Sequence, residues 1–74
     1  MPELDRIVLY TVLDHPWISE KGIDFLTKSR FELVDIDRAI KRLHALRLIS
    51  VHYAPHRVYV PSAPFVRSMR NEQN

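Results

Sequence analysis

The first helix is predicted by apolar residues that recur at helical spacing near the N-terminus. Over residues 3–13 the positions of the main stripe are Leu4, Ile7, Val8, Thr11 and Val12. We expect this helix to end at residue 14 or 15, because the residue before Pro16 is displaced from the helical region of backbone conformation.

Two more helices are predicted before residue 48. The second covers residues 20–27, with Ser19 as its N-cap, and Gly22 should weaken it by about 0.5–1 kcal/mol relative to alanine. Two starts are open for the third helix, since Ser29 with Glu32 has the spacing of a capping box and Asp35 is a rival N-cap. Its apolar stripe, the clearest in the chain, consists of Leu33, Ile36, Ile40, Leu43 and either Leu46 or Arg47.

After Leu48 and Ile49 the pattern changes to that of strands. The segments SVHY and RVYV are rich in β-branched and aromatic residues, and Pro55 lies between them at a turn position. We expect a two-stranded hairpin with one face against the helices, since a hairpin alone is only marginally stable. The predicted fold class is mainly α with this small β-hairpin. Residues 1–62 form the domain, and residues 63–74 form a tail that is either a short helical turn capped by Ser62 or disordered.

Composition places the chain among small folded proteins. Its 74 residues make one domain, and the absence of cysteine excludes disulfides and cysteine-based zinc sites. No apolar run approaches the roughly 20 residues that span a bilayer, and the N-terminal MPELDR carries two acids where a signal peptide is positive. We therefore expect a soluble cytoplasmic protein without membrane contact.

Charge is divided unevenly along the chain. Residues 1–37 carry eight acidic and four basic side chains, whereas residues 38–70 carry seven basic and no acidic ones. A uniformly basic half indicates a polyanionic partner. The alternative is a basic face that contacts only solvent.

The order helix, helix, helix, strand, strand resembles that of winged helix-turn-helix domains over residues 3–61. The stretch HPWISEKGIDFLTKSRFELVDIDRAIKRLHALRLISV is similar to the central region of small bacterial and archaeal winged-helix regulators. The matching residues are Ile18 before the second helix, Ile36, Ile40 and Leu43 along the third, and Leu48 with Ile49 at the first strand. The wing is shorter than usual, and the family usually has glycine where Arg47 stands. We therefore expect either an unfavourable backbone conformation at Arg47 or a different exit from the helix.

This resemblance implies sequence-specific binding of double-stranded DNA by a transcriptional regulator, or by an accessory factor of a phage or plasmid. One α-helix fits the major groove of B-form DNA. On the third helix we expect Arg38 to contact guanine, since a guanidinium can bind O6 and N7 together, and Lys41 and Arg42 to hold phosphates. The other residues expected at the DNA are His44 on the same helix and His56 and Arg57 at the hairpin tip.

Three acidic residues oppose this interpretation. Glu32, Asp35 and Asp37 lie at the start of the predicted recognition helix, where they repel phosphate unless they serve as caps or accept from N4 of cytosine. The alternative function is therefore a winged-helix module that docks on another protein, as a complex subunit or an inhibitor, without binding DNA.

A homodimer is expected because one short helix and one small hairpin offer few contacts to DNA, and two-fold symmetry doubles them. Leu9, Tyr10 and Leu13 make a second face of the first helix apolar, which is more than one small core requires. The expected dimer contacts are these three residues together with Phe65 and Met69 of the tail.

Other candidate chemistry is sparse. His52 and His56 are spaced as an H-x3-H pair, but two neutral ligands without cysteine or a nearby acid fall short of a metal site. No spacing of serine, histidine and acid indicates nucleophilic catalysis, and no glycine loop is placed to hold a nucleotide. We predict that the chain is not an enzyme and needs no cofactor, metal or small-molecule ligand.

The aromatic residues have structural interpretations. Trp17, Phe25 and Phe31 are expected to be core or subunit-contact residues. Tyr53 and Tyr59 of the hairpin are expected to pack on the third helix.

Overall fold

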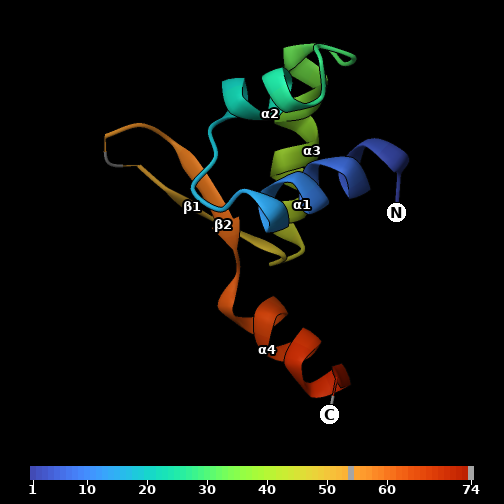
Figure 1. Cartoon of the computed structure of the whole chain (residues 1–74), viewed down its shortest axis with the longest axis vertical. Helices are drawn as coiled ribbons and strands as arrows, with labels where there is room; N and C mark the ends of the chain where they lie inside the picture. The colour runs from blue at the N-terminus through green and yellow to red at the C-terminus, as the bar shows by residue number, and fades with distance from the viewer. Residues whose placement is uncertain (54, 74) are drawn as a thin grey trace.

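A computed structural model of the chain describes residues 1–53 and 55–73, with side chains described up to residue 70. Over these residues it contains four helices and one antiparallel hairpin, in the predicted order (Figure 1). The elements are α1 (Glu3–Asp14), α2 (Glu20–Leu26), α3 (Leu33–Ala45), β1 (Ile49–His52), β2 (Val58–Pro61) and α4 (Ala63–Gln73). The prediction of a mainly helical chain with a small hairpin is confirmed.

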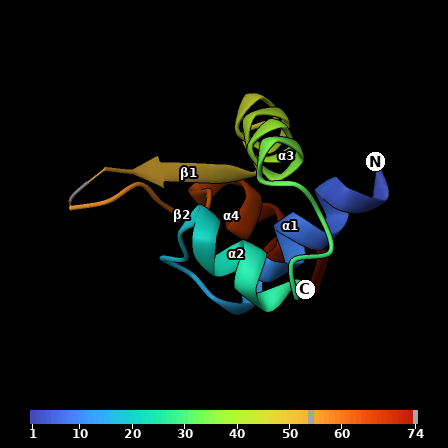
Figure 2. The same ribbon diagram turned by 90° about the horizontal axis from the view of Figure 1, so that it is seen from above.

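The core lies between α1, α2, α3 and the inner face of the hairpin. Seen from above, the hairpin extends to one side of these helices (Figure 2). The middle of each predicted apolar stripe points inward, with Val8 and Val12 on α1 and Ile36, Ile40 and Leu43 on α3, as expected for amphipathic helices around one core. The end positions predicted for the third helix are wrong, because Leu33, Leu46 and Arg47 are exposed. The core residues are Val8, Leu9 and Val12 of α1, Ile23 of α2, Ile36, Ala39, Ile40 and Leu43 of α3, and Ile49 and Tyr59 of the hairpin.

The start of α2 combines a side-chain cap with a close backbone approach. The Ser19 hydroxyl accepts a hydrogen bond from the backbone N–H of Gly22 at 3.1 Å, which confirms the predicted N-cap. A Cβ added at Gly22 would lie 2.7 Å from Cγ1 of Ile18, closer than carbon atoms can pack. Gly22 therefore allows the preceding segment to lie against the helix.

Helix α3 begins between the two predicted starts, after the one that Ser29 implies and before the one that Asp35 implies. Glu32 is its N-cap, and Leu33 is its first residue. Both predicted N-caps, Ser29 and Asp35, are therefore wrong. Ser29 instead lies in the turn after α2, where its φ is 55°.

The end of α3 is closed by a Schellman motif with arginine at the position where glycine is usual. The N–H of Arg47 donates to the carbonyl of His44 at 2.9 Å, and the N–H of Leu48 donates to that of Leu43 at 3.0 Å. The φ of Arg47 is 61°, in the left-handed region. The unfavourable backbone conformation expected at this residue is confirmed.

The same motif closes α2 with a lysine. The N–H of Lys28 donates to the carbonyl of Phe25 at 3.0 Å, and that of Ser29 donates to Asp24 at 2.9 Å. The φ of Lys28 is 58°. Each of these two helices is thus followed by a cationic residue, Lys28 after α2 and Arg47 after α3. The negative end of a helix dipole favours a positive charge at this place.

The hairpin is joined to the segment before α2. Its strands pair from Ile49 opposite Pro61 to His52 opposite Val58. Outside the hairpin, the N–H of Trp17 donates to the Tyr59 carbonyl and the N–H of Tyr59 donates to the Ile18 carbonyl, each at 2.9 Å. This bridge between Ile18 and Tyr59 holds the connection between α1 and α2 against β2.

The residues of the hairpin differ in burial. Tyr59 is buried in the core, as predicted. Tyr53 is 70 % exposed, so the packing on α3 predicted for it is wrong. It lies beyond the last paired residue of β1, where the hairpin has left the helices.

Helix α4 projects from the end of β2 (Figure 1), and its 11 residues exceed the short turn predicted for the tail. The Ser62 hydroxyl accepts from the N–H of Phe65 at 3.2 Å, which confirms the predicted cap, and donates to the carbonyl of Arg47. Phe65 packs against the core. One serine therefore joins the end of α3 to the start of α4.

Candidate nucleic-acid interface

The outward face of α3 presents two basic side chains. Because Ile36, Ile40 and Leu43 face the core, Arg38 and Lys41 lie on the opposite side of the helix. Their side chains are 67 % and 72 % exposed. Arg38 and Lys41 therefore lie off the apolar face of the helix, as expected, and are accessible to solvent.

The acidic residues of α3 lie beside these cations. The Asp37 carboxylate is 3.0 Å from the ammonium of Lys41, and the Asp35 carboxylate is 3.9 Å from the guanidinium of Arg38. Exposed pairs at such spacings contribute only about 0.3–0.5 kcal/mol to a helix, so a phosphate can compete for either cation. The acids weaken the positive potential of this face and leave its cations accessible.

Arg42 differs from its neighbours because its guanidinium is bound within the protein. Its Nε and Nη2 atoms donate to the two carboxylate oxygens of Asp5 at 2.8 and 2.6 Å. The Asp5 side chain is almost fully buried, and these hydrogen bonds hold its pKa below the usual range. Arg42, predicted to hold a phosphate, thus links α3 to α1 through Asp5.

The hairpin brings a further cation to α3. The Arg57 guanidinium lies 5.7 Å from the centre of the Tyr53 ring, within the range of a cation–π contact. A hollow between α3 and the hairpin is lined by residues of both, including Lys41, His44, Tyr53 and Arg57. The structure thus brings together three of the residues predicted to contact DNA: Lys41, His44 and Arg57.

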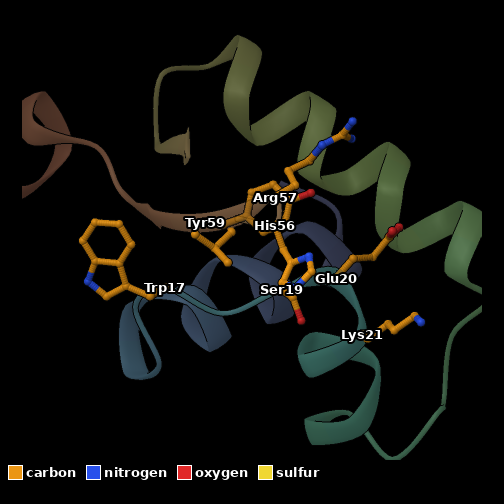
Figure 3. A pocket seen from close by; sticks show the side chains of 8 residues that line it. Trp17, Ser19, Glu20, Lys21, His56, Arg57 and Tyr59 are labelled. Atoms are coloured by element: carbon orange, nitrogen blue, oxygen red, sulfur yellow. The ribbon is translucent and has the colours of Figure 1, made fainter. Parts of the chain in front are cut away.

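A second hollow lies on the other side of Arg57, between the hairpin and the start of α2 (Figure 3). The burial of Tyr59 at its floor raises the pKa of that phenol. The lining residues are Trp17, Ser19, Glu20, Lys21, His56, Arg57, Val58 and Tyr59. Of these, the sequence pointed only to His56 and Arg57, because the backbone bridge that brings Trp17 to the hairpin leaves no local pattern.

The expected dimer contacts divide between core and surface. Leu9 is only 6 % exposed and belongs to the core, so its predicted place at a subunit interface is wrong. Leu13 is half-buried and packs against the core. Tyr10 is exposed, and Phe65 and Met69 are half-buried on α4.

Apolar side chains gather at the end of α2 and the start of α3. Phe25, expected in the core or at a subunit contact, is 79 % exposed and therefore lies outside the core. Leu33 of the predicted apolar stripe also lies outside the core. We call Phe25, Leu26, Leu33 and Val34 the α2–α3 apolar residues.

The described residues contain neither a metal-binding cluster nor a membrane-spanning helix. No group of three or more histidine, aspartate or glutamate side chains within them is arranged to hold a metal ion. Within the same residues, none of the helices has the length and apolar character needed to cross a membrane.

No family model, curated protein or solved structure matches the chain.

Proposed function

We propose that this chain is a winged helix-turn-helix protein that binds double-stranded DNA in a sequence-specific manner. In this proposal α3 is the recognition helix and the hairpin is the wing. The observation that carries the proposal is the meeting of Lys41, His44 and Arg57 around one hollow, with Arg38 exposed on the same helix.

The element order supports the proposal. Three helices precede the hairpin, and the Ile18–Tyr59 bridge holds the segment before α2 against it. A helix packed in this way leaves its outer face free to enter a major groove, while the wing reaches the adjacent backbone.

Roles follow from the chemistry of each side chain. Arg38 would bind O6 and N7 of guanine, and Lys41 and Arg57 would contact phosphates. His44 and His56 would donate to the backbone at either edge of the contact. Arg42 has a positioning role, because its bond to Asp5 fixes α3 relative to α1.

Regulation of transcription is the biological role proposed for this binding, in the cytoplasm and as a homodimer. Two copies would double the small contact that one α3 and one wing can make. Tyr10, Phe65 and Met69 remain the candidate dimer contacts once Leu9 is assigned to the core.

Fluorescence anisotropy with labelled duplexes tests the proposal. Binding should weaken steeply as salt is raised, and a duplex from the gene's own upstream region should bind more tightly than a random one. Lys41→Gln should lower the salt slope by about one for all sequences, whereas Arg38→Ala should also reduce discrimination between them. Arg6→Gln, on the exposed side of α1, is the matched control for loss of one charge.

Docking on another protein is the second candidate function, and the exposed α2–α3 apolar residues favour it. Two of them, Leu33 and Val34, lie at the start of α3, the part of a recognition helix that usually comes closest to the bases. Charge reversal at Arg38 and Lys41 without effect on binding to DNA, together with loss of a partner in Val34→Glu, would support docking.

A further inference from the structure

Trp17 is held in an unfavourable position that its burial does not explain. Its φ is 72°, in a region that bulky residues rarely adopt. The backbone on both sides is fixed to Tyr59 by hydrogen bonds, yet 61 % of Trp17 is exposed. Strain at an exposed aromatic residue points to a role in contact with another molecule.

The indole has an available aromatic surface. Its ring centre lies 4.9 Å from that of His52, with the two planes tilted by 52°. This contact leaves more than half of the residue accessible. Trp17 also lines the hollow between the hairpin and α2, so its exposed surface adjoins a concave site.

Two further side chains of this hollow, Lys21 and His56, carry nitrogen groups that can donate hydrogen bonds to phosphate. Figure 3 shows the Trp17 ring at one end, the ammonium of Lys21 at the other and the His56 imidazole between them. Glu20 is the acid among the lining residues, and its carboxylate points toward α3. Lys21 and His56 therefore offer hydrogen-bond donors that the acid does not cover.

We propose that this hollow binds an unpaired nucleotide of a single-stranded nucleic acid. An exposed aromatic ring next to cationic side chains is the arrangement that binds single strands, since every base has a π-face on which to stack. The base stacks on Trp17, and the phosphate on its 3′ or 5′ side is held by Lys21 and His56.

Arg57 connects this site to the duplex surface. It lines both the hollow beside α3 and the hollow beside Trp17. The role of Arg57 in this inference rests on the proposed function, because in the inference and in the proposed function alike the hairpin contacts nucleic acid. Trp17 and Lys21, by contrast, take no part in the proposed duplex contact.

Intrinsic fluorescence tests the inference directly, because Trp17 is the only tryptophan in the chain. We expect a short oligothymidylate to quench this fluorescence in a saturable manner. Lys21→Gln should weaken that titration several-fold, while Arg6→Gln, which removes one exposed charge from α1, should leave it nearly unchanged.

A labelled oligothymidylate extends the test to variants without tryptophan. In anisotropy, Trp17→Leu should lose roughly ten-fold in affinity through lost stacking, and Trp17→Phe should recover part of it. Thermal unfolding of each variant checks that the fold is retained. If Trp17→Leu does not fold, the loss of affinity in Lys21→Gln, a change at an exposed position, tests the inference instead.

The outcomes separate this inference from duplex binding. If duplex DNA binds and the single strand leaves the Trp17 fluorescence unchanged, the inference is overturned and the proposed function stands. If the single strand quenches Trp17 with the expected dependence on Lys21 while duplex fails to bind, the inference holds and the proposed function fails.

Discussion

Arg42 holds the buried carboxylate of Asp5 with two hydrogen bonds, from α3 across to α1. The pair joins the first turn of α1 to the last turn of α3 and so fixes the helix proposed to enter the major groove. The hydrogen bonds from Arg42 lower the pKa of Asp5 by stabilising its charged form, against a smaller opposing effect of burial.

Acid should therefore weaken the fold through Asp5. Since its folded-state pKa lies below the unfolded value of about 3.9, its contribution is complete above that pH and is lost as the pH falls through the folded-state pKa. Asp5→Asn should lower the free energy of unfolding at neutral pH by about 1–2 kcal/mol and flatten this part of the acid dependence. Urea unfolding at several pH values measures both effects, and an unchanged acid limb in the variant would contradict the role of the pair.

Replacing Arg42 should affect stability and leave the electrostatics of DNA binding nearly unchanged. In Arg42→Gln the Asp5 carboxylate loses its charged partner, so the midpoint of thermal unfolding should fall. The salt slope of duplex binding, measured well below that midpoint, should match that of the unchanged chain. A slope reduced by about one, as expected for Lys41→Gln, would instead return Arg42 to the DNA surface.

Glycine at position 47 should stabilise the chain. The left-handed conformation of Arg47 is unfavourable for a residue with a Cβ and costs glycine nothing. After allowance for the greater freedom of glycine in the unfolded state, Arg47→Gly should raise the free energy of unfolding by about 0.5–1 kcal/mol. Arg47→Ala, which removes the charge and keeps the strain, is the control and should give no gain.

Alanine at position 22 should destabilise the chain although alanine favours helices. The added Cβ would meet Ile18 Cγ1, and overpacking of this kind costs about 1–3 kcal/mol against a helix gain of up to about 1 kcal/mol. We expect Gly22→Ala to lose about 1 kcal/mol in chemical unfolding. In an Ile18→Ala background, which removes the obstructing atom, the same change should become neutral or stabilising.

Glutamate substitutions on α1 should separate core from surface. Leu9→Glu places a charge in the core and should cost about 3 kcal/mol or more, enough to unfold so small a domain. Tyr10→Glu should fold normally, because Tyr10 is exposed. If Tyr10 contributes to a dimer, size-exclusion chromatography of this variant should show a smaller species than the unchanged chain.

Local rules were sufficient for features made within one or two turns of the chain. The caps at Ser19 and Ser62 and the inward faces of α1 and α3 follow from spacing alone. Even the strain at Arg47 was predictable, because glycine is expected at that position of a helix exit.

Features that join distant segments were not predictable in this way. Asp5 and Arg42 meet only because α1 crosses α3, so the basic character of Arg42 indicated a phosphate contact that its buried partner replaces. The apolar character of Phe25 was compatible with the core or with a subunit contact, and α2 turns it outward. An apolar side chain in a short helix carries too little periodicity to show which way it faces.

The bridge between Ile18 and Tyr59 also bears on how this chain folds. The helices and the hairpin each close short loops, whereas the bridge joins the first third of the chain to its last third and, like the Asp5–Arg42 pair, requires closure of a long loop. We expect the separate helices and the hairpin to form before these long-range contacts. The same bridge would then be among the first parts to open in the native state, with faster hydrogen exchange at the Trp17 and Tyr59 amides than in the middle of α3.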